Sequence, residues 1–174
     1  MQESILSSLE DATTSNLDTF HPSSPSWSLL RSATFESIRL AGTVTGPARI
    51  CQETVRLRSD PNLSLPKGQA ATLSAYYIHR QRGAWGEDAD KYNHQRFVKG
   101  DPDVGEANFV IWGLKGPHMC PGRWFAVQTI MIMVKVLLEN YEFKQKRVLG
   151  DEEKYIYKGG IVGRKEVGGV ARKR

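Results

Sequence analysis

Apolar residues recur at helical spacing in two segments of the chain. The first segment covers residues 26–40, and Gly42 lies just beyond it, where a glycine C-cap falls. Its apolar positions are Trp27, Leu29, Leu30, Ala33, Phe35, Ile38 and Leu40. The second segment, residues 121–142, opens with a proline at the first turn and consists almost wholly of good helix formers or large apolar residues. Both patterns predict α-helices.

Alternating polarity and turn residues predict short β elements between and after these helices. Two long helices with short β elements make the predicted fold class mainly α with small β hairpins. The chain has no visible internal repeat. In chain order, the pattern predicts strands over 48–51 and 53–57, turns at 61–62 and 66–68, strand or early helix over 69–79, a polar loop over 82–90, an irregular loop over 98–120 and a small hairpin over 155–170.

Residues 1–28 are rich in Ser and Thr, and a short apolar pattern at their start indicates one short helix followed by a loop. We expect the N-terminal segment, residues 1–25, to be poorly ordered. It lacks the basic region and apolar run of a secretory signal. The longest apolar stretch, residues 127–138, is interrupted by Lys135 and falls short of the roughly 20 residues that span a bilayer. The sequence therefore predicts a cytosolic chain without a membrane span.

Composition limits the classes of partner. The chain has 174 residues, of which 40% are apolar, enough for one domain with a core. Two cysteines, Cys51 and Cys120, exclude a disulfide framework and a zinc site built on four cysteines. The net charge is +5, but much of the excess lies in residues 163–174, without a zinc finger or RNA-binding signature. We therefore expect no nucleic-acid partner.

Residues 112–126 carry the most informative chemistry. Cys120 ends a glycine-rich loop at the mouth of a predicted helix, where the helix dipole and free backbone N–H groups stabilise a thiolate. Gly116 and Gly122 let the backbone pass close to a flat ligand, and His118 can donate to an acidic group at the edge of that ligand. Haem, with its iron and its propionates, meets both requirements.

Other interpretations of this loop stay open at the level of single residues. Cys120 could be a buried free cysteine at the start of a helix, or it could pair with Cys51 in a disulfide. A phosphate-binding P-loop is excluded, because no Gly-Lys-Ser/Thr follows the glycines.

Two further segments supply charges that can meet. Glu36 and Arg39 are three residues apart, on one face of the first predicted helix, where an acid and a guanidinium can pair. Arg96, within residues 88–97, can join the same carboxylate. Ordinary surface ion pairs, which contribute little, explain the same residues equally well when each segment is taken by itself.

In this order, the segments resemble the cytochrome P450 superfamily. Glu36 and Arg39 match the family's Glu-x-x-Arg on its K helix, and Arg96 with Phe97 matches its later Arg-Phe motif. The loop matches the haem-binding signature. Its matching positions are Gly116 as the second glycine, His118 as the basic position, Cys120 as the thiolate ligand, Gly122 as the closing glycine, and then Arg123, Phe125 and Ala126.

A second Glu-x-x-Arg, at Glu53, competes with Glu36 for the K-helix position. In the family this motif is followed by a propionate-binding Arg, a Pro-Lys-Gly turn and a His-Arg pair. Glu36 has the whole series, with Arg49, residues 66–68 and residues 79–80, whereas Glu53 leaves no room for the first step. Glu36 is therefore the better match, and the resemblance runs from about residue 26 to about residue 145.

The sequence also departs from the family pattern. Gly113 occupies the family's Phe position before the ligand, and the nearest ring is Trp112. His94 and Gln95 precede the Arg-Phe motif in place of Pro-Glu. Only 35 residues lie before Glu36, without an Ala-Gly-x-x-Thr pattern for oxygen activation. We therefore expect the chain to be the C-terminal, haem-proximal portion of such an enzyme.

The resemblance implies a partial P450 fold with K helix, meander, Cys-ligand loop and L helix, in a single incomplete domain over residues 1–174. It implies haem b bound through the Cys120 thiolate, with Arg49 and His118 on the propionates and Gly116 and Gly122 beside the ring. It also implies a structural triad of Glu36, Arg39 and Arg96.

The implied function is a haem-thiolate monooxygenase that oxidises a small apolar organic substrate, in fungal secondary-metabolite or lipid metabolism, and that is truncated and inactive alone. Its electron donor would be NADPH-cytochrome P450 reductase, docked near Lys115, Arg123 and Lys135. Full-length relatives would lie on the endoplasmic-reticulum membrane and face the cytosol. Two alternatives are a non-catalytic haem-binding or interaction fragment that needs a partner chain, and a small basic domain with chance similarity.

Overall fold

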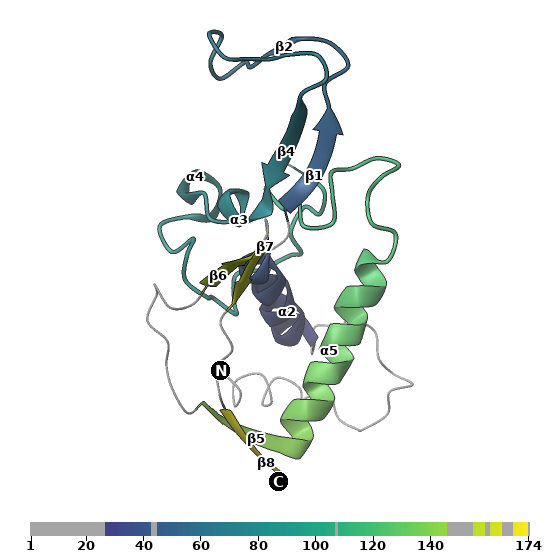
Figure 1. The fold of residues 1–174 in the computed structure, drawn as a ribbon. Helices are drawn as coiled ribbons and strands as arrows, with labels where there is room; N and C mark the ends of the chain where they lie inside the picture. Colours follow the sequence, from purple (N-terminus) through teal and green to yellow (C-terminus); the bar gives the residue numbers. More distant parts are fainter. Residues whose placement is uncertain are drawn as a thin grey trace.

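The computed structural model describes residues 27–42, 45–106, 108–145, 155–158, 161–164 and 169–173 (Figure 1). The predicted N-terminal segment, residues 1–25, lies outside the described residues. The helices are α2 (Ser28–Ala41), α3 (Ala75–Ile78), α4 (Arg82–Trp85) and α5 (Arg123–Asn140). The strands are β1 (Thr45–Ile50), β2 (Val55–Arg56), β3 (Ser64–Leu65), β4 (Ala70–Ser74), β5 (Tyr141–Gln145), β6 (Tyr155–Lys158), β7 (Ile161–Arg164) and β8 (Gly169–Lys173).

The core forms where α2 packs against α5 and against the loops that join α4 to α5. The apolar positions of α2 supply its centre, because residues three and four apart lie on one face of a helix. Its buried members come from all three segments: Trp27, Leu30, Ala33, Phe35, Phe97, Val104, Phe109, Val127 and Met131. Helix α2 is therefore fixed by burial along its length.

Phe35 is the hub of an aromatic cluster in this core. Its ring lies edge-on to Phe97 at 6.0 Å, to Phe109 at 6.1 Å and to Trp112 at 6.5 Å between centroids. Edge-to-face contacts of this kind add about 0.5–1.5 kcal/mol per pair beyond the area that they bury. The cluster ties the middle of α2 to the start of residues 112–120, the glycine-rich loop that ends at Cys120 and that we name the cysteine loop.

Residues 45–74 form an arm that projects from the body of the molecule (Figure 1). Strands β1 and β4 pair antiparallel with an irregularity between Thr45 and Ala48, and β2 pairs with β3 beyond them. Gly68, at φ +84°, forms the turn that returns the chain, and its N–H donates to the carbonyl of Cys51 at 2.8 Å. We name this segment the β arm.

The two predicted helices are confirmed as α2 and α5, with bounds one or two residues from those expected. The predicted hairpin near the C-terminus is present as β6 and β7, whereas the pairing of β8 with β5 has no signal in the pattern. The polar loop predicted over 82–90 is wrong at its start, where α4 forms one turn. No helix among the described residues is long and apolar enough to cross a membrane.

Candidate functional site

Glu36 and Arg39 lie three residues apart on α2, and both side chains are fully buried. Arg39 donates two hydrogen bonds to the carboxylate, from Nε to Oε2 at 2.7 Å and from Nη2 to Oε1 at 2.8 Å. Its Nη1 donates to the backbone carbonyls of His79 and Ala89. A buried charge pair is tolerated where such additional hydrogen bonds offset its desolvation, and this pair has them.

Arg96, from the loop after α4, adds a second guanidinium to the Glu36 carboxylate, with 3.2 Å between Nε and Oε1. The backbone N–H of Asn93 donates to the same oxygen at 3.0 Å. Arg96 also donates to the carbonyls of Trp85 and Asp88, and the Asp88 carboxylate lies 2.9 Å from its Nη2. The hydrogen bond from Arg96 lowers the pKa of Asp88. We name Glu36, Arg39 and Arg96 the Glu–Arg–Arg cluster.

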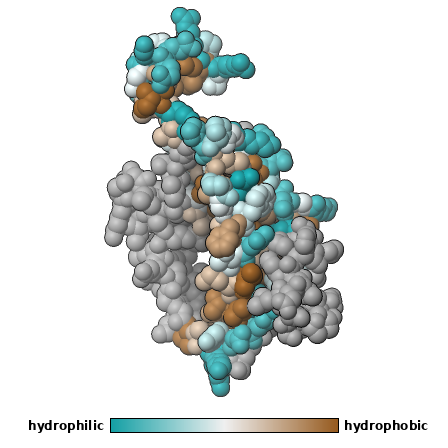
Figure 2. Space-filling model, turned by 90° about the vertical axis from the view of Figure 1, so that its right-hand side faces the viewer, coloured by the Kyte–Doolittle hydropathy of each residue, from teal (hydrophilic) through white to brown (hydrophobic). Residues whose placement is uncertain are grey.

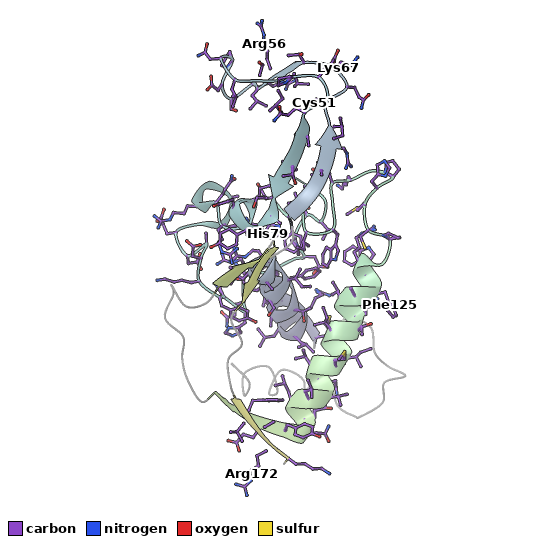
Figure 3. All side chains as sticks on the ribbon, in the orientation of Figure 1. Cys51, Arg56, Lys67, His79, Phe125 and Arg172 are labelled. Atoms are coloured by element: carbon purple, nitrogen blue, oxygen red, sulfur yellow. The ribbon has the colours of Figure 1, made fainter. Side chains whose placement is uncertain are left out.

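The competing Glu-x-x-Arg lies elsewhere in the molecule. Glu53 and Arg56 are exposed in the outer part of the β arm, where Arg56 is labelled in Figure 3. An exposed acid and base contribute at most about 1 kcal/mol to stability even where they pair, whereas removal of one partner from a buried pair leaves an uncompensated charge in the core. The two matches, equal in sequence, therefore differ completely in environment.

Backbone hydrogen bonds close the cysteine loop on itself. The N–H of Cys120 donates to the carbonyl of Trp112 at 2.9 Å, so the two ends of the loop are joined. The N–H of Gly113 donates to the carbonyl of Val110 at 3.0 Å, and Gly113 has a φ of +90°. Glycine adopts such a positive φ without a steric penalty, which allows the tight turn at the start of the loop.

A second contact holds the loop against residues 103–106. The N–H of Lys115 donates to the carbonyl of Gly105 at 2.9 Å, and the N–H of Gly105 donates to Phe109. Gly105 has a φ of +84°, and a Cβ built there would lie 2.7 Å from Cε of Met119. The same Cβ would lie 3.0 Å from the backbone nitrogen of Lys115, so the positive φ and this backbone contact both favour glycine at the crossing. Sequence reasoning misses Gly105, because the contact joins residues that no motif connects.

Gly113 stands at the family's Phe position, and the structure shows where the nearest ring, that of Trp112, lies instead. The ring of Trp112 packs into the core, 5.7 Å from Phe109 and 6.5 Å from Phe35 between centroids. The aromatic ring nearest the family's Phe position therefore lies with the core cluster, and Gly113 serves as the turn after it.

Cys120 is exposed and free, three residues before α5 begins at Arg123. Arg123 donates from Nη1 to its carbonyl at 3.0 Å, which fixes the backbone but leaves the sulfur uncovered. Cys51 is also free and lies half-buried beyond the outer end of β1, well out along the β arm (Figure 3). The disulfide alternative is therefore wrong, and so is the alternative of a buried Cys120.

The other site residues predicted from the sequence fall in two places. Gly116, His118 and Gly122 lie with Cys120 in or beside the loop and are exposed. Arg49 lies exposed on β1, and its Nη1 donates to the carbonyl of Ala48 at 2.8 Å. Within the described part of the chain, no hydrogen bond or ion pair joins Arg49 to the loop.

The surface around Cys120 suits a flat apolar ligand. A Cβ built at Gly116 or at Gly122 would meet no heavy atom within 4 Å, so the backbone there is open to close approach. Trp124 and Phe125, in the first turn of α5, are 44% and 75% exposed, and Phe125 projects from the helix (Figure 3). Among the described residues, no three or more His, Cys, Asp or Glu side chains are grouped so that they could hold a metal ion by themselves. The donor set, one soft sulfur beside apolar surface, fits haem.

The basic residues near the loop all contact other groups of the chain, but their side chains differ in exposure. Lys115 forms an ion pair with the exposed Glu106, and Lys135 forms one with Glu139 one turn further along α5. The side chain of Lys135 is only 16% exposed. Arg123 is held by its hydrogen bond to the loop. Each cation is thus paired or oriented within the chain itself.

The chain combines a buried Glu–Arg–Arg cluster, built on α2, with a glycine-rich loop that presents one exposed cysteine, as the sequence led us to expect. The family model described as "Cytochrome P450" matches residues 21–166, which is most of the chain. The chain therefore belongs to the cytochrome P450 family.

Curated relatives come from plants and from a fungus. "Cytochrome P450 709B1" of Arabidopsis thaliana is 28% identical over 116 residues, 66% of this chain and 22% of that protein. "Cytochrome P450 monooxygenase ecdH" of Aspergillus rugulosus is 32% identical over 117 residues, 66% of this chain and 23% of that protein. "11-oxo-beta-amyrin 30-oxidase" of Glycyrrhiza uralensis is 34% identical over 85 residues, 48% of this chain and 16% of that protein. The chain spans about a fifth of the length of the curated relatives it matches.

Proposed function

We propose that the described residues form the proximal side of a haem-thiolate monooxygenase and bind haem b through the sulfur of Cys120. The observation that supports this most is the exposed, free cysteine at the end of a loop that backbone hydrogen bonds close and clamp. A ligand held on such a loop keeps its position when the iron changes state, because both ends of the loop are fixed.

Bound haem would supply the activation of O2 and the transfer of one oxygen atom to an organic substrate. This chain's residues would orient it. Gly116 and Gly122 leave the backbone open to the ring, and Phe125 offers apolar contact beside it. Arg49 and His118 are exposed cations or donors that would hold the propionates through charge-assisted hydrogen bonds.

The substrate class proposed is a small apolar organic molecule. Membership of the cytochrome P450 family supports an oxidation. The relatives come from plants and a fungus, and we propose a role in fungal secondary-metabolite or lipid metabolism. Turnover would need an oxygen-activating segment in addition to the residues described, so we propose that this chain is inactive alone. We also propose that full-length relatives act on the cytosolic face of the endoplasmic reticulum.

NADPH-cytochrome P450 reductase is the proposed electron donor. Lys115 and Arg123 lie at the loop and at the start of α5, where an acidic partner would approach the sulfur side of the haem. Long-range attraction between such patches raises association rates more than affinity. Lys135 is a weaker candidate, because its ammonium is paired with Glu139 and largely covered.

Reconstitution with haem tests the ligand. We expect the chain, reduced under CO, to give the Soret band of a thiolate-ligated haem, because Cys120 is the exposed sulfur of the loop. Cys120→Ser should abolish this band, and Cys51→Ser, which changes the other free cysteine, should leave it. A band typical of histidine ligation, or equal behaviour of the two variants, would overturn the assignment.

A second candidate function is a non-catalytic haem-binding or interaction fragment that pairs with another chain. The exposed apolar side chains of α5 favour it, because a contiguous apolar surface is a common mark of an interface. Haem uptake without turnover, even when a reductase and a second chain that supplies an oxygen-activating segment are both added, would favour this candidate over the monooxygenase.

A further inference from the structure

His79 uses both nitrogens of a fully buried ring to join two distant segments. Its Nδ1 lies 3.0 Å from the backbone carbonyl oxygen of Arg39, and its Nε2 lies 3.0 Å from the backbone nitrogen of Val110. The N–H of Val110 can only donate, so Nε2 must be the unprotonated acceptor. The carbonyl of Arg39 can only accept, so Nδ1 carries the proton. The contacts thus specify one tautomer of the neutral ring.

The surroundings of His79 hold the ring in this orientation. It stacks on Phe109 with 5.0 Å between centroids and 21° between planes, and Trp85 meets it edge-on at 6.4 Å. A Cβ built at Gly42 would lie 3.2 Å from Nδ1, so the end of α2 approaches the ring closely. Figure 3 places His79 at the junction of the β arm with the body of the molecule.

Arg39 is bound to His79 twice. Its backbone carbonyl accepts the proton of Nδ1, while its guanidinium donates to the backbone carbonyl of His79. The guanidinium is in turn held by the Glu36 carboxylate. His79 is therefore rigidly attached to the Glu–Arg–Arg cluster, and its Nε2 presents a fixed acceptor on the other side.

Val110 carries this attachment to the cysteine loop. Its N–H is held by His79, and its carbonyl accepts the N–H of Gly113. Two residues further along the chain, the carbonyl of Trp112 accepts the N–H of Cys120. A continuous series of hydrogen bonds and short backbone steps thus runs from Arg39 through His79 and Val110 to Cys120.

We infer that His79 is a positioning residue: it orients the loop that presents Cys120 by fixing the Val110 amide to the end of α2. The loop-orienting role concerns the chain itself, and its effect on a haem ligand rests on the proposed function. A ring that only filled space could be replaced by another aromatic. A ring that positions the loop needs an acceptor at Nε2, because the buried Val110 N–H would otherwise lack a partner.

Two amide substitutions separate these roles, because each reproduces one nitrogen of the ring. His79→Gln places an amide oxygen near Nε2, where it can accept from Val110, whereas His79→Asn reaches only the Nδ1 position near Arg39. His94→Asn makes the same change at a half-buried histidine away from the loop and serves as the control. Hydrogen exchange of the Val110 amide, measured by NMR on the full chain without haem, is the first readout.

We expect His79→Asn to speed exchange of the Val110 amide by about tenfold or more, with the Gln variant much closer to wild type and the control unchanged. Nitrogen chemical shifts of wild-type His79 should show the proton on Nδ1. A proton on Nε2 in the wild-type chain would overturn the inference even if no variant folds. Unchanged Val110 exchange in a folded His79→Asn chain would overturn it as well.

Haem-loaded samples then report on the ligand. The thiolate-type Soret band of the CO complex should be weakened by His79→Asn, largely restored by His79→Gln and unaffected by His94→Asn. A wild-type chain without that band would contradict the proposed function but leave the exchange and tautomer results to decide the role of His79. A full band in the Asn variant would contradict the link between His79 and Cys120.

Discussion

At the scale of single residues, the stability of this chain depends on buried charges that are completely satisfied. The Glu36 carboxylate is fully buried and accepts from Arg39, Arg96 and the backbone N–H of Asn93. Removing one partner from such a set leaves the others buried without compensation.

Replacement of Glu36 by Gln should lower the free energy of unfolding by roughly 3–5 kcal/mol, because the fully buried Arg39 loses its counterion and Arg96 keeps only Asp88. Urea denaturation measures this difference. Glu53→Gln is the matched control, since it makes the same change in the exposed Glu-x-x-Arg of the β arm, and it should change stability by less than about 1 kcal/mol. Equal effects of the two substitutions would contradict the role of Glu36.

Acid should destabilise the chain through His79. Burial, with the charges of Arg39 and Arg80, lowers the pKa of this histidine from 6.5 to about 4. Between these values the unfolded chain binds a proton that the folded chain refuses, so the free energy of unfolding falls as the pH falls. The loss should total about 3 kcal/mol between pH 6.5 and pH 4. A free energy of unfolding that does not change between pH 6.5 and pH 4 would contradict the prediction. So would a His79→Gln chain whose free energy of unfolding depends on pH as strongly as that of the wild-type chain.

At the scale of elements, the sequence predicts what local pattern controls. Helices α2 and α5 follow from apolar periodicity and end signals, and the cysteine loop follows from its glycines and its place before a helix. Helix α4 has no such pattern. Its single turn is held by distant partners, as Trp85 donates to the carbonyl of Ile78 and its own carbonyl accepts from Arg96.

The same distinction applies within the candidate site. The spacing of Glu36 and Arg39 predicts their pairing, because residues three apart share a face of a helix. The contact of His79 with Val110 joins residues 31 positions apart through one ring nitrogen. Such a contact depends on how elements pack, and no residue pattern encodes it directly.

The crossing of the cysteine loop over Gly105 gives a test at this scale. Gly105→Ala should lower the free energy of unfolding by about 1–3 kcal/mol, because its φ of +84° strains an L residue and the new Cβ would crowd the backbone nitrogen of Lys115 at 3.0 Å. Gly83→Ala, in α4, adds a Cβ with no atom within 4 Å and should leave stability unchanged or raise it by up to about 1 kcal/mol. Thermal denaturation compares the two variants. A destabilised Gly83→Ala chain together with an unaffected Gly105→Ala chain would contradict the close contact of the cysteine loop with Gly105.

At the scale of the whole molecule, the outer face of α5 is unusually apolar. Phe125 and Met133 are 75% and 58% exposed, and Val136 and Leu137 lie near the end of the same helix. Figure 2, which views the molecule from the side of α5, shows hydrophobic residues on this surface. The same helix buries Val127 and Met131 in the core. It is therefore apolar on more than one face, unlike most surface helices.

This exposed face predicts that the chain binds the hydrophobic dye ANS at neutral pH and associates with itself in sedimentation experiments. The double variant Phe125→Ser and Met133→Ser should reduce both effects several-fold. Leu63→Ser, which removes an exposed apolar side chain from the β arm, is the control and should reduce them little. If Leu63→Ser reduced ANS binding and self-association equally, the exposed face of α5 would not be the surface responsible.

The central claim is that the Cys120 sulfur is the ligand that this loop presents to haem iron. X-ray absorption at the iron edge of the haem-loaded chain tests it most directly. We predict one sulfur atom bound to iron in the wild-type chain and in Cys51→Ser, and none in Cys120→Ser. Iron bound only by nitrogen or oxygen in the wild-type chain, or sulfur that survives Cys120→Ser, would contradict the account.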